Sequence, residues 1–170
     1  DSPRRLNFRI PLMTWTHFAA TYDSKSGISC VLINGSVAAE ATEKKPCPID
    51  HDASDLRVGV SYFGKHRTGF NGMVSDLRIW NVSRQPAQIV SQMRGMTMPP
   101  SNAVRQGLVL LLSMEPPGIE QQGEGTTVSD WSGTGNHGSL VHHAKLVKLA
   151  QPKAQFAPPL SLRALCQMVL

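Results

Sequence analysis

The longest strand signal in the sequence is Phe70-Asn-Gly-Met-Val-Ser-Asp-Leu-Arg-Ile-Trp-Asn81. From position 73 its residues alternate, and a period of two predicts a strand, because successive side chains on a strand point to opposite faces. Both faces contain apolar residues, so we expect this strand to be covered on both sides. One face holds Met73, Ser75, Leu77 and Ile79, and the other holds Val74, Asp76, Arg78 and Trp80.

Upstream of this strand, the pattern repeats between turn signals. Trp15–Tyr22 alternates with residues that can be buried on both sides. Asn34-Gly35 is a strong hairpin signal, because a type I′ turn needs positive φ at both central positions. The other expected strands are Arg4–Ile10, Ile28–Ile33, Ser36–Thr42 and Leu56–Tyr62, with a polar loop over Glu43–Ser54.

Downstream, one helix and further strands are expected. Ser83–Met93 has the pattern of a short helix with Ser83 as its N-cap. Gly107–Ser113 has the length of a buried strand, and Ser139–Leu149 is a second strand candidate. Leu160–Leu170 fits either a short amphipathic helix or an edge strand. Strands separated by turns, with a single short helix, predict a mainly β fold: an antiparallel β-sandwich.

Composition excludes several classes of protein. Among 170 residues, 17 Lys and Arg face 12 Asp and Glu, a net charge of +5. The basic residues form no dense run and are not interleaved with aromatics, which total 6%, so we expect no nucleic-acid partner. No apolar run approaches the roughly 20 residues of a membrane span. The charge therefore indicates an ordinary solvated surface.

The cysteines bear on the cellular compartment. Cys30, Cys47 and Cys166 are odd in number, and no CxxC is present. Such usage fits a reducing compartment better than a disulfide scaffold, so an intracellular location is favoured over secretion. The sequons at Asn34 and Asn81 fall where turns favour Asn in any case. Because the first residue is Asp, we expect an excised segment of a larger protein.

Four motifs, in order, resemble the second half of a laminin-G-like module of the concanavalin A-like superfamily, a jelly roll. They are Trp15-Thr-His-Phe-Ala-Ala-Thr-Tyr-Asp23, Val31-Leu-Ile-Asn-Gly35, Leu56-Arg-Val-Gly59 and Phe70–Asn81. The resemblance covers roughly residues 10–95. Gly107-Leu-Val-Leu-Leu-Leu112 and the turn around Asp130-Trp-Ser-Gly133 are similar to the start of such a module.

This order implies an incomplete or permuted module. Residues 1–98 are expected to form the C-terminal half of a laminin-G-like sandwich, followed by a linker at 99–106. Residues 107–150 either close the same sandwich or begin a second module, and 151–170 form a tail. The front half of a typical module is missing before Trp15, which would leave strand edges unpaired.

The same superfamily includes endoglucanases, so the resemblance also implies that such a module can carry catalytic carboxyl groups. Retaining glycosidases use two carboxyl groups about 5–5.5 Å apart. The family's catalytic strand resembles Glu-x-Asp-x-x-Glu, which has no match here, and Asp50 and Asp52 lie beside Pro48 in a polar loop. We therefore expect no enzyme activity.

The resemblance also implies a calcium site. Laminin-G-like modules often hold calcium at turns, where Asp130 and Asn136 are the candidate ligands. The alternative, which we favour, is that Asp130 caps the Gly-rich turn through hydrogen bonds to the backbone. Of the three tryptophans, Trp131 is the ligand-binding candidate, because Trp15 and Trp80 lie in strands at core positions of the family.

The histidines show no zinc spacing. His142 and His143 are adjacent and would point to opposite faces of a strand, and surface or turn histidines are the favoured interpretation. His17 lies between Trp15 and Ala19 and is interpreted as a hydrogen-bonded histidine at the edge of the core.

These observations favour a non-catalytic recognition or scaffold module of a larger multidomain protein. Its partner would be a protein or a glycan, bound by loops such as Glu43–Ser54 and Tyr62–Gly69. A calcium-assisted carbohydrate-binding module is the first alternative, and a glycoside hydrolase fragment is the second.

Overall fold

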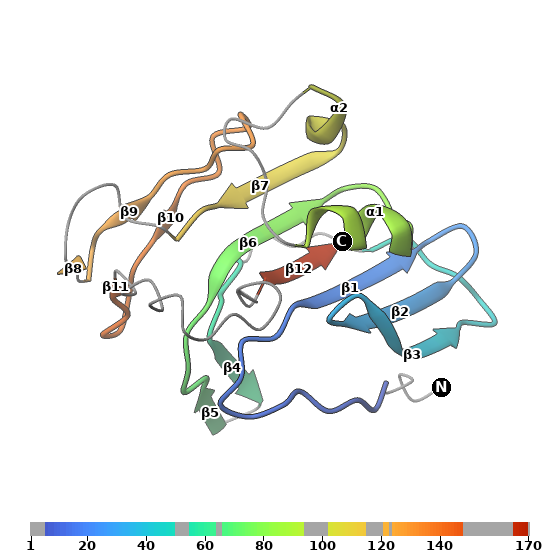
Figure 1. The fold of residues 1–170 in the computed structure, drawn as a ribbon, viewed down its shortest axis with the longest axis horizontal. Coiled ribbons are helices and arrows are strands. Elements are labelled where there is room, and N and C mark those ends of the chain that lie inside the picture. Colours follow the sequence, from blue (N-terminus) through green and yellow to red (C-terminus); the bar gives the residue numbers. More distant parts are fainter. Residues whose placement is uncertain are drawn as a thin grey trace, which may run out of the picture.

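A six-stranded sheet forms the centre of the molecule (Figure 1). The computed structural model describes residues 6–49, 55–63, 66–93, 102–114, 121–122, 124–147 and 165–169. Across the sheet the order is β3 (Ser36–Thr42), β2 (Ile28–Ile33), β1 (Phe18–Asp23), β12 (Leu165–Val169), β6 (Ser75–Trp80) and β7 (Leu108–Leu112).

Three two-stranded ribbons and two short helices complete the described elements. The ribbons pair β4 (Val60–Phe63) with β5 (His66–Gly69), β9 (Thr127–Val128) with β10 (Gly138–Ser139), and β8 (Gln121–Gln122) with β11 (Leu146–Val147). The helices are α1 (Pro86–Gln92) and α2 (Asn102–Arg105). The prediction of a mainly β, antiparallel fold with a short helix after the Trp80 strand is confirmed. The single turn α2 lies within the segment expected to be a linker.

The predicted hairpin joins β2 to β3. Asn34 and Gly35 have φ of 50° and 81°, as a type I′ turn requires. Asn34 also ties this turn to the residue before β1, because its N–H donates to the His17 carbonyl at 2.8 Å and its Oδ1 accepts from the His17 N–H at 2.9 Å. A single asparagine therefore shapes the hairpin and holds it against the neighbouring strand.

The helix starts later than the sequence suggests. Ser83 was expected to be the N-cap, but Gln85 holds that position and Pro86 is the first helical residue. Proline suits the first turn because its missing N–H has no partner there in any helix. The Gln88 side chain accepts from the Gln85 N–H at 2.9 Å, which reinforces this start.

Several expected strands are wrong or shortened. The strand expected at Leu56–Tyr62 begins only at Val60, and the one expected at Trp15–Tyr22 begins only at Phe18. Residues 6–10 of the predicted Arg4–Ile10 strand are not in a strand, and Phe8 instead packs its ring on Phe18 at 5.6 Å. Between Ser139 and Val147 only the ends are in strands, because His142 and His143 form a turn with positive φ. Of the predicted Ser139–Leu149 strand, positions 148–149 lie outside the described residues, and the described part has strand pairing only at Ser139 and at Leu146–Val147.

The most consequential difference concerns the C-terminal segment. Leu160–Leu170 was expected to be a helix or an edge strand, but β12 lies inside the sheet, between β1 and β6. It is parallel to both, with Phe18 opposite Cys166 on one side and Ile79 opposite Met168 on the other. Backbone pairing with two unoccupied edges therefore decides the state of this segment, which its side-chain pattern leaves open.

Apolar side chains pack on both faces of the sheet. On one face, Ile89 of α1 packs with Ala19, Cys30 and Leu32, and Figure 1 shows α1 lying against the sheet near β12. On the other, Leu77 and Ile79 pack with Leu110, Leu112, Val128 and Leu146. This two-sided burial explains why the Phe70–Asn81 stretch is apolar on both faces. In the described part of the chain, no helix has the length and apolar character that a membrane crossing requires.

Candidate functional site

The turn around Asp130 is a dense hydrogen-bond network. Asp130 Oδ1 accepts from the backbone N–H of Leu111 at 2.9 Å and of Ser132 at 2.8 Å. Its Oδ2 accepts from the Ser132 hydroxyl at 2.7 Å and from the Asn136 N–H at 3.0 Å. The Thr134 hydroxyl lies 2.9 Å from the same oxygen and divides its one hydrogen between Asp130 and the Val109 carbonyl.

This network strongly favours the ionised form of Asp130. Burial alone would raise the pKa of its carboxyl group. Hydrogen bonds from the backbone of Ser132 and Leu111, and from the hydroxyls of Ser132 and Thr134, outweigh burial and lower the pKa to about 2. Asp130 therefore links the Gly-rich turn to β7 as a charged acceptor.

The two candidate calcium ligands are brought together by this turn. Besides the backbone contact with Asp130, Asn136 donates its Nδ2 hydrogens to the Val109 carbonyl and the Thr134 hydroxyl, both at 2.9 Å. An ion bound by Asp130 would have to replace hydrogen bonds that the turn already makes. The calcium site stays a prediction. Among the described residues, no three His, Cys, Asp or Glu side chains lie close enough to form a metal site.

The three tryptophans differ in exposure. Trp80 is fully buried and Trp15 is partly buried, whereas 47% of Trp131 is exposed. The backbone beneath Trp131 is fixed, because its N–H donates to the Leu111 carbonyl at 2.8 Å and Asp130 pairs with Leu112. Trp131 is thus an indole at the surface on a backbone tied to the central sheet.

The predicted binding loops lie apart from this turn in the sequence and fold differently from each other. The described part of Glu43–Ser54 is held to β1, where the Tyr22 hydroxyl donates to the Cys47 carbonyl at 2.8 Å. Tyr62–Gly69 was expected to be a loop, but Val60–Phe63 and His66–Gly69 pair as β4 and β5. Positions 50–54 and 64–65 lie outside the described residues.

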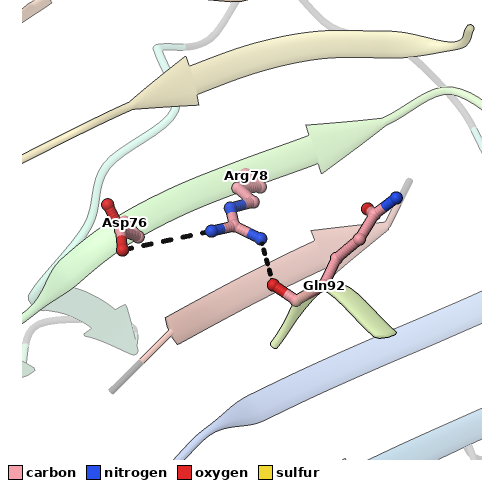
Figure 2. A network of polar contacts seen from close by, with 3 residues as sticks. All are labelled: Asp76, Arg78 and Gln92. Atoms are coloured by element: carbon pink, nitrogen blue, oxygen red, sulfur yellow. Dashed lines mark hydrogen bonds and ion pairs between the residues drawn. The ribbon is translucent and has the colours of Figure 1, made fainter. Parts of the chain in front are cut away.

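A second polar group lies under α1, and the sequence did not identify it as a site. Arg78 is only 1% exposed and donates from Nη1 to the Gln92 carbonyl at 2.8 Å, while its Nη2 lies 4.0 Å from Asp76 (Figure 2). Arg84 donates to Oε1 of Gln92 at 3.0 Å and lies over the Trp80 ring, 4.9 Å from its centroid. In the sequence, the alternation that places Asp76, Arg78 and Trp80 on one strand face was the signal that could have identified this group.

Several nitrogens of this group have no hydrogen-bond partner among the described residues. They are Nδ1 and Nε2 of His17, Nε of Arg78, Nε of Arg84 and Nε1 of Trp80. His17 is completely buried, so the expectation that its ring would be hydrogen-bonded is wrong for the described part of the chain. Buried donors without acceptors are costly, at about 1–3 kcal/mol each. We call His17, Arg78, Trp80 and Arg84 the donor cluster.

Burial also shifts the ionisation of the donor cluster. Desolvation, reinforced by the positive charge of Arg78, lowers the pKa of His17 to about 4. Desolvation lowers the pKa of Arg78 to about 10, with Asp76 opposing and Arg84 adding to the shift. Near neutral pH the cluster therefore holds a neutral imidazole and two guanidinium groups, with a single carboxylate, Asp76, beside Arg78.

The chain belongs to the concanavalin A-like lectin/glucanase superfamily. A laminin-G family model of that superfamily matches residues 4–90, just over half of the 170 residues. The match includes β1, β2, β3 and β6 and most of α1, in agreement with the resemblance found in the sequence. No curated protein matches the chain.

The structure is similar to a crystal structure of a protein from Bacteroides ovatus ATCC 8483, to which carbohydrate binding has been provisionally assigned. The two share 26% sequence identity and superpose with a TM-score of 0.60. The similarity covers 84% of this chain but 39% of the other, so the chain spans about two fifths of that protein's length. The structural similarity therefore extends well beyond residues 4–90, which the family model matches.

Proposed function

We propose that the chain is a non-catalytic recognition module whose ligand is a carbohydrate. The superfamily membership and the similarity to the Bacteroides protein support a binding module. The observation that carries the choice of ligand is Trp131, a half-exposed indole on a turn anchored to β7. An apolar ring face on a rigid backbone suits the stacking of a sugar ring, because little conformational entropy is lost on binding.

Replacing Trp131 tests this proposal directly. We expect W131A to weaken binding of the best glycan on an array by at least about tenfold, equivalent to ~1.4 kcal/mol, when titrated by calorimetry. F70A is the matched control, because Phe70 is another exposed aromatic outside this turn. A blank glycan array, or equal loss in both variants, would refute carbohydrate recognition through Trp131.

The absence of catalysis is part of the proposal. No glycosidase-like acid motif occurs in the sequence, and Asp130, the ionised acid nearest Trp131 in sequence, is held as a hydrogen-bond acceptor. Incubation with the oligosaccharides that bind should release no reducing sugar above a buffer control. Release that survives purification of the protein to homogeneity would show that the module is an enzyme.

Calcium-assisted binding is a second candidate, based on Asp130 and Asn136. Calorimetric titration with calcium chloride would show uptake by the wild type and none by D130N. Absence of heat in the wild type would exclude the calcium site while leaving calcium-independent glycan binding open to the array.

Protein recognition is the third candidate, and one observation favours it. Leu12 and Met13 precede β1 with their apolar side chains almost entirely exposed. Exposed apolar residues of this size suit a protein contact. If the module is a scaffold, a pull-down should recover proteins with the wild type and lose them with L12S/M13S, whereas W131A should have no effect.

A further inference from the structure

The position of β12 is unusual for this sheet. Every other strand pair in the described part of the chain is antiparallel, whereas β12 is parallel to both β1 and β6. It follows that β1 and β6 run in the same direction, one strand apart. A strand of the opposite direction would fit between them with two antiparallel ladders, which are the more stable kind.

The fit of β12 is also incomplete. On β1 it pairs with Phe18, Ala19 and Ala20, while the rest of the strand, Thr21–Asp23, has no partner from β12. On β6 the register shifts between Leu165 and Gln167. Short and irregular pairing implies that few hydrogen bonds hold this strand, so a better-matched strand would displace it at little cost.

The donor cluster lies beside the position that β12 occupies between β1 and β6. Ala19, position 167 and Arg78 lie side by side across three strands, so they share one face of the sheet. That face is the one against α1, because Ala19 packs with Ile89 and Arg78 donates to Gln92. His17, one of the members with unpartnered nitrogens, directly precedes β1.

The buried positive charges and unpaired donors on this face indicate which side chain of an added strand would fit there. Arg78 and Arg84 are both buried, and among the described residues their ion pairing joins only Arg78 to Asp76, at the long distance of 4.0 Å. The ring nitrogens of His17 and Nε of Arg78 have no acceptor within the described residues. A carboxylate in the row of Ala19 and Arg78 would accept from buried donors and balance the positive charge, which is a strong arrangement in a dry environment.

We propose that the gap between β1 and β6 is a binding site for a separate extended peptide, with β12 as its exchangeable occupant. The peptide adds antiparallel to both strands and places an Asp or Glu side chain in the row of Ala19 and Arg78. Main-chain hydrogen bonds supply affinity and the acidic side chain supplies specificity, as in other cases of strand addition. This inference is independent of carbohydrate binding at Trp131.

The test uses two fluorescent nine-residue peptides of alternating valine and threonine, one with a central glutamate and the other with glutamine. Anisotropy is measured with the full chain and with Q167P, in which proline removes a main-chain donor and weakens β12. We expect Q167P to bind the glutamate peptide about tenfold more tightly than the wild type does, and about tenfold more tightly than it binds the glutamine peptide. R78K should reduce the preference for glutamate to less than about threefold.

Hydrogen exchange on the wild-type chain keeps the test valid if a variant does not fold. Saturating glutamate peptide should speed exchange at residues 165–169 and slow it at 18–23, because the peptide replaces β12. Failure of the wild type and Q167P to bind either peptide, or binding without preference for glutamate, would overturn the proposal. A dimer that exchanges β12 between copies, seen by analytical ultracentrifugation, would also overturn it by making a second copy the occupant.

Discussion

The fold lowers the pKa values of both Asp130 and His17, for different physical reasons. Asp130 receives hydrogen bonds that hold its charge, whereas burial, reinforced by the positive charge of Arg78, lowers the pKa of His17 and keeps its ring neutral. Both residues therefore link stability to pH, but in different pH ranges. The sequence indicated the capping role of Asp130 from its place in a Gly-rich turn, but it could not show that the His17 ring has no hydrogen-bond partner in the described part of the chain.

Asp130 is expected to stabilise the fold only while it is ionised. Its pKa is about 2 in the folded chain and about 3.8 when unfolded, so its contribution is complete above pH 3.8 and is lost as the pH falls towards 2. D130N should cost about 3 kcal/mol of unfolding free energy in urea at pH 7, because the amide cannot accept at both oxygens. D55N, at an exposed acid, should change stability by less than about 0.5 kcal/mol.

His17 should make stability depend on pH with the same sign as Asp130, but at milder pH, because its pKa is also lower in the folded chain. The pKa of His17 is 6.5 in the unfolded chain and about 4 in the folded chain, so the unfolded chain binds a proton first as the pH falls. The free energy of unfolding should therefore fall by about 3 kcal/mol as the pH is lowered from 6.5 to 4. H17L should remove this slope in urea titrations at several pH values. H143N, at an exposed turn histidine, should leave it unchanged. A slope that persists in H17L would show that another group is responsible.

At the scale of elements, α1 was predictable from local sequence signals, whereas β12 was not. The sequence located α1 within three residues of its start, because apolar spacing and a nearby proline are local signals. It could not place β12, because the same residues suit a helix or a strand and only the free edges of β1 and β6 decide between them. Local propensity is a weak guide where tertiary pairing competes with it.

The buried apolar contact of α1 with the sheet comes from one residue. Ile89 is completely buried with Ala19, Cys30 and Leu32, whereas Val90 beside it is exposed. We expect I89A to lower the unfolding free energy by about 3 kcal/mol and V90A by less than about 1 kcal/mol, measured by chemical denaturation. Equal effects of the two substitutions would mean that α1 does not cover this face in solution.

At the scale of the whole molecule, β6 belongs to two apolar clusters, one with Leu110 and Leu112 and the other formed by Trp80, Leu108 and Leu111. Leu77 and Ile79 face the cluster of Leu110 and Leu112, while Arg78 and Trp80 belong to the donor cluster under α1. Because both clusters need the same strand, neither can lose its order without affecting the other. We therefore expect the described part of the chain to unfold in a single cooperative transition.

Paired substitutions on the two faces test this expectation. L110A and I89A lie in different clusters, so their costs should add within about 0.5 kcal/mol in the double variant. Tryptophan fluorescence and far-ultraviolet circular dichroism should report the same denaturation midpoint in each variant. Separated midpoints would show that the two sides of the sheet unfold independently.

Local sequence patterns were enough to predict the β class, the Asn34–Gly35 hairpin, the β2 and β3 bounds and the resemblance to the superfamily, because period-two alternation and turn chemistry are local properties. It also led to Asp130, Trp131 and Asn136, although their ligands stay proposals. The tertiary structure was needed to show that residues 165–169 lie between β1 and β6, and that His17 and Arg78 have buried nitrogens without acceptors among the described residues. Those features depend on which distant segments become neighbours, and side-chain burial across three strands is not encoded in the spacing of any one of them.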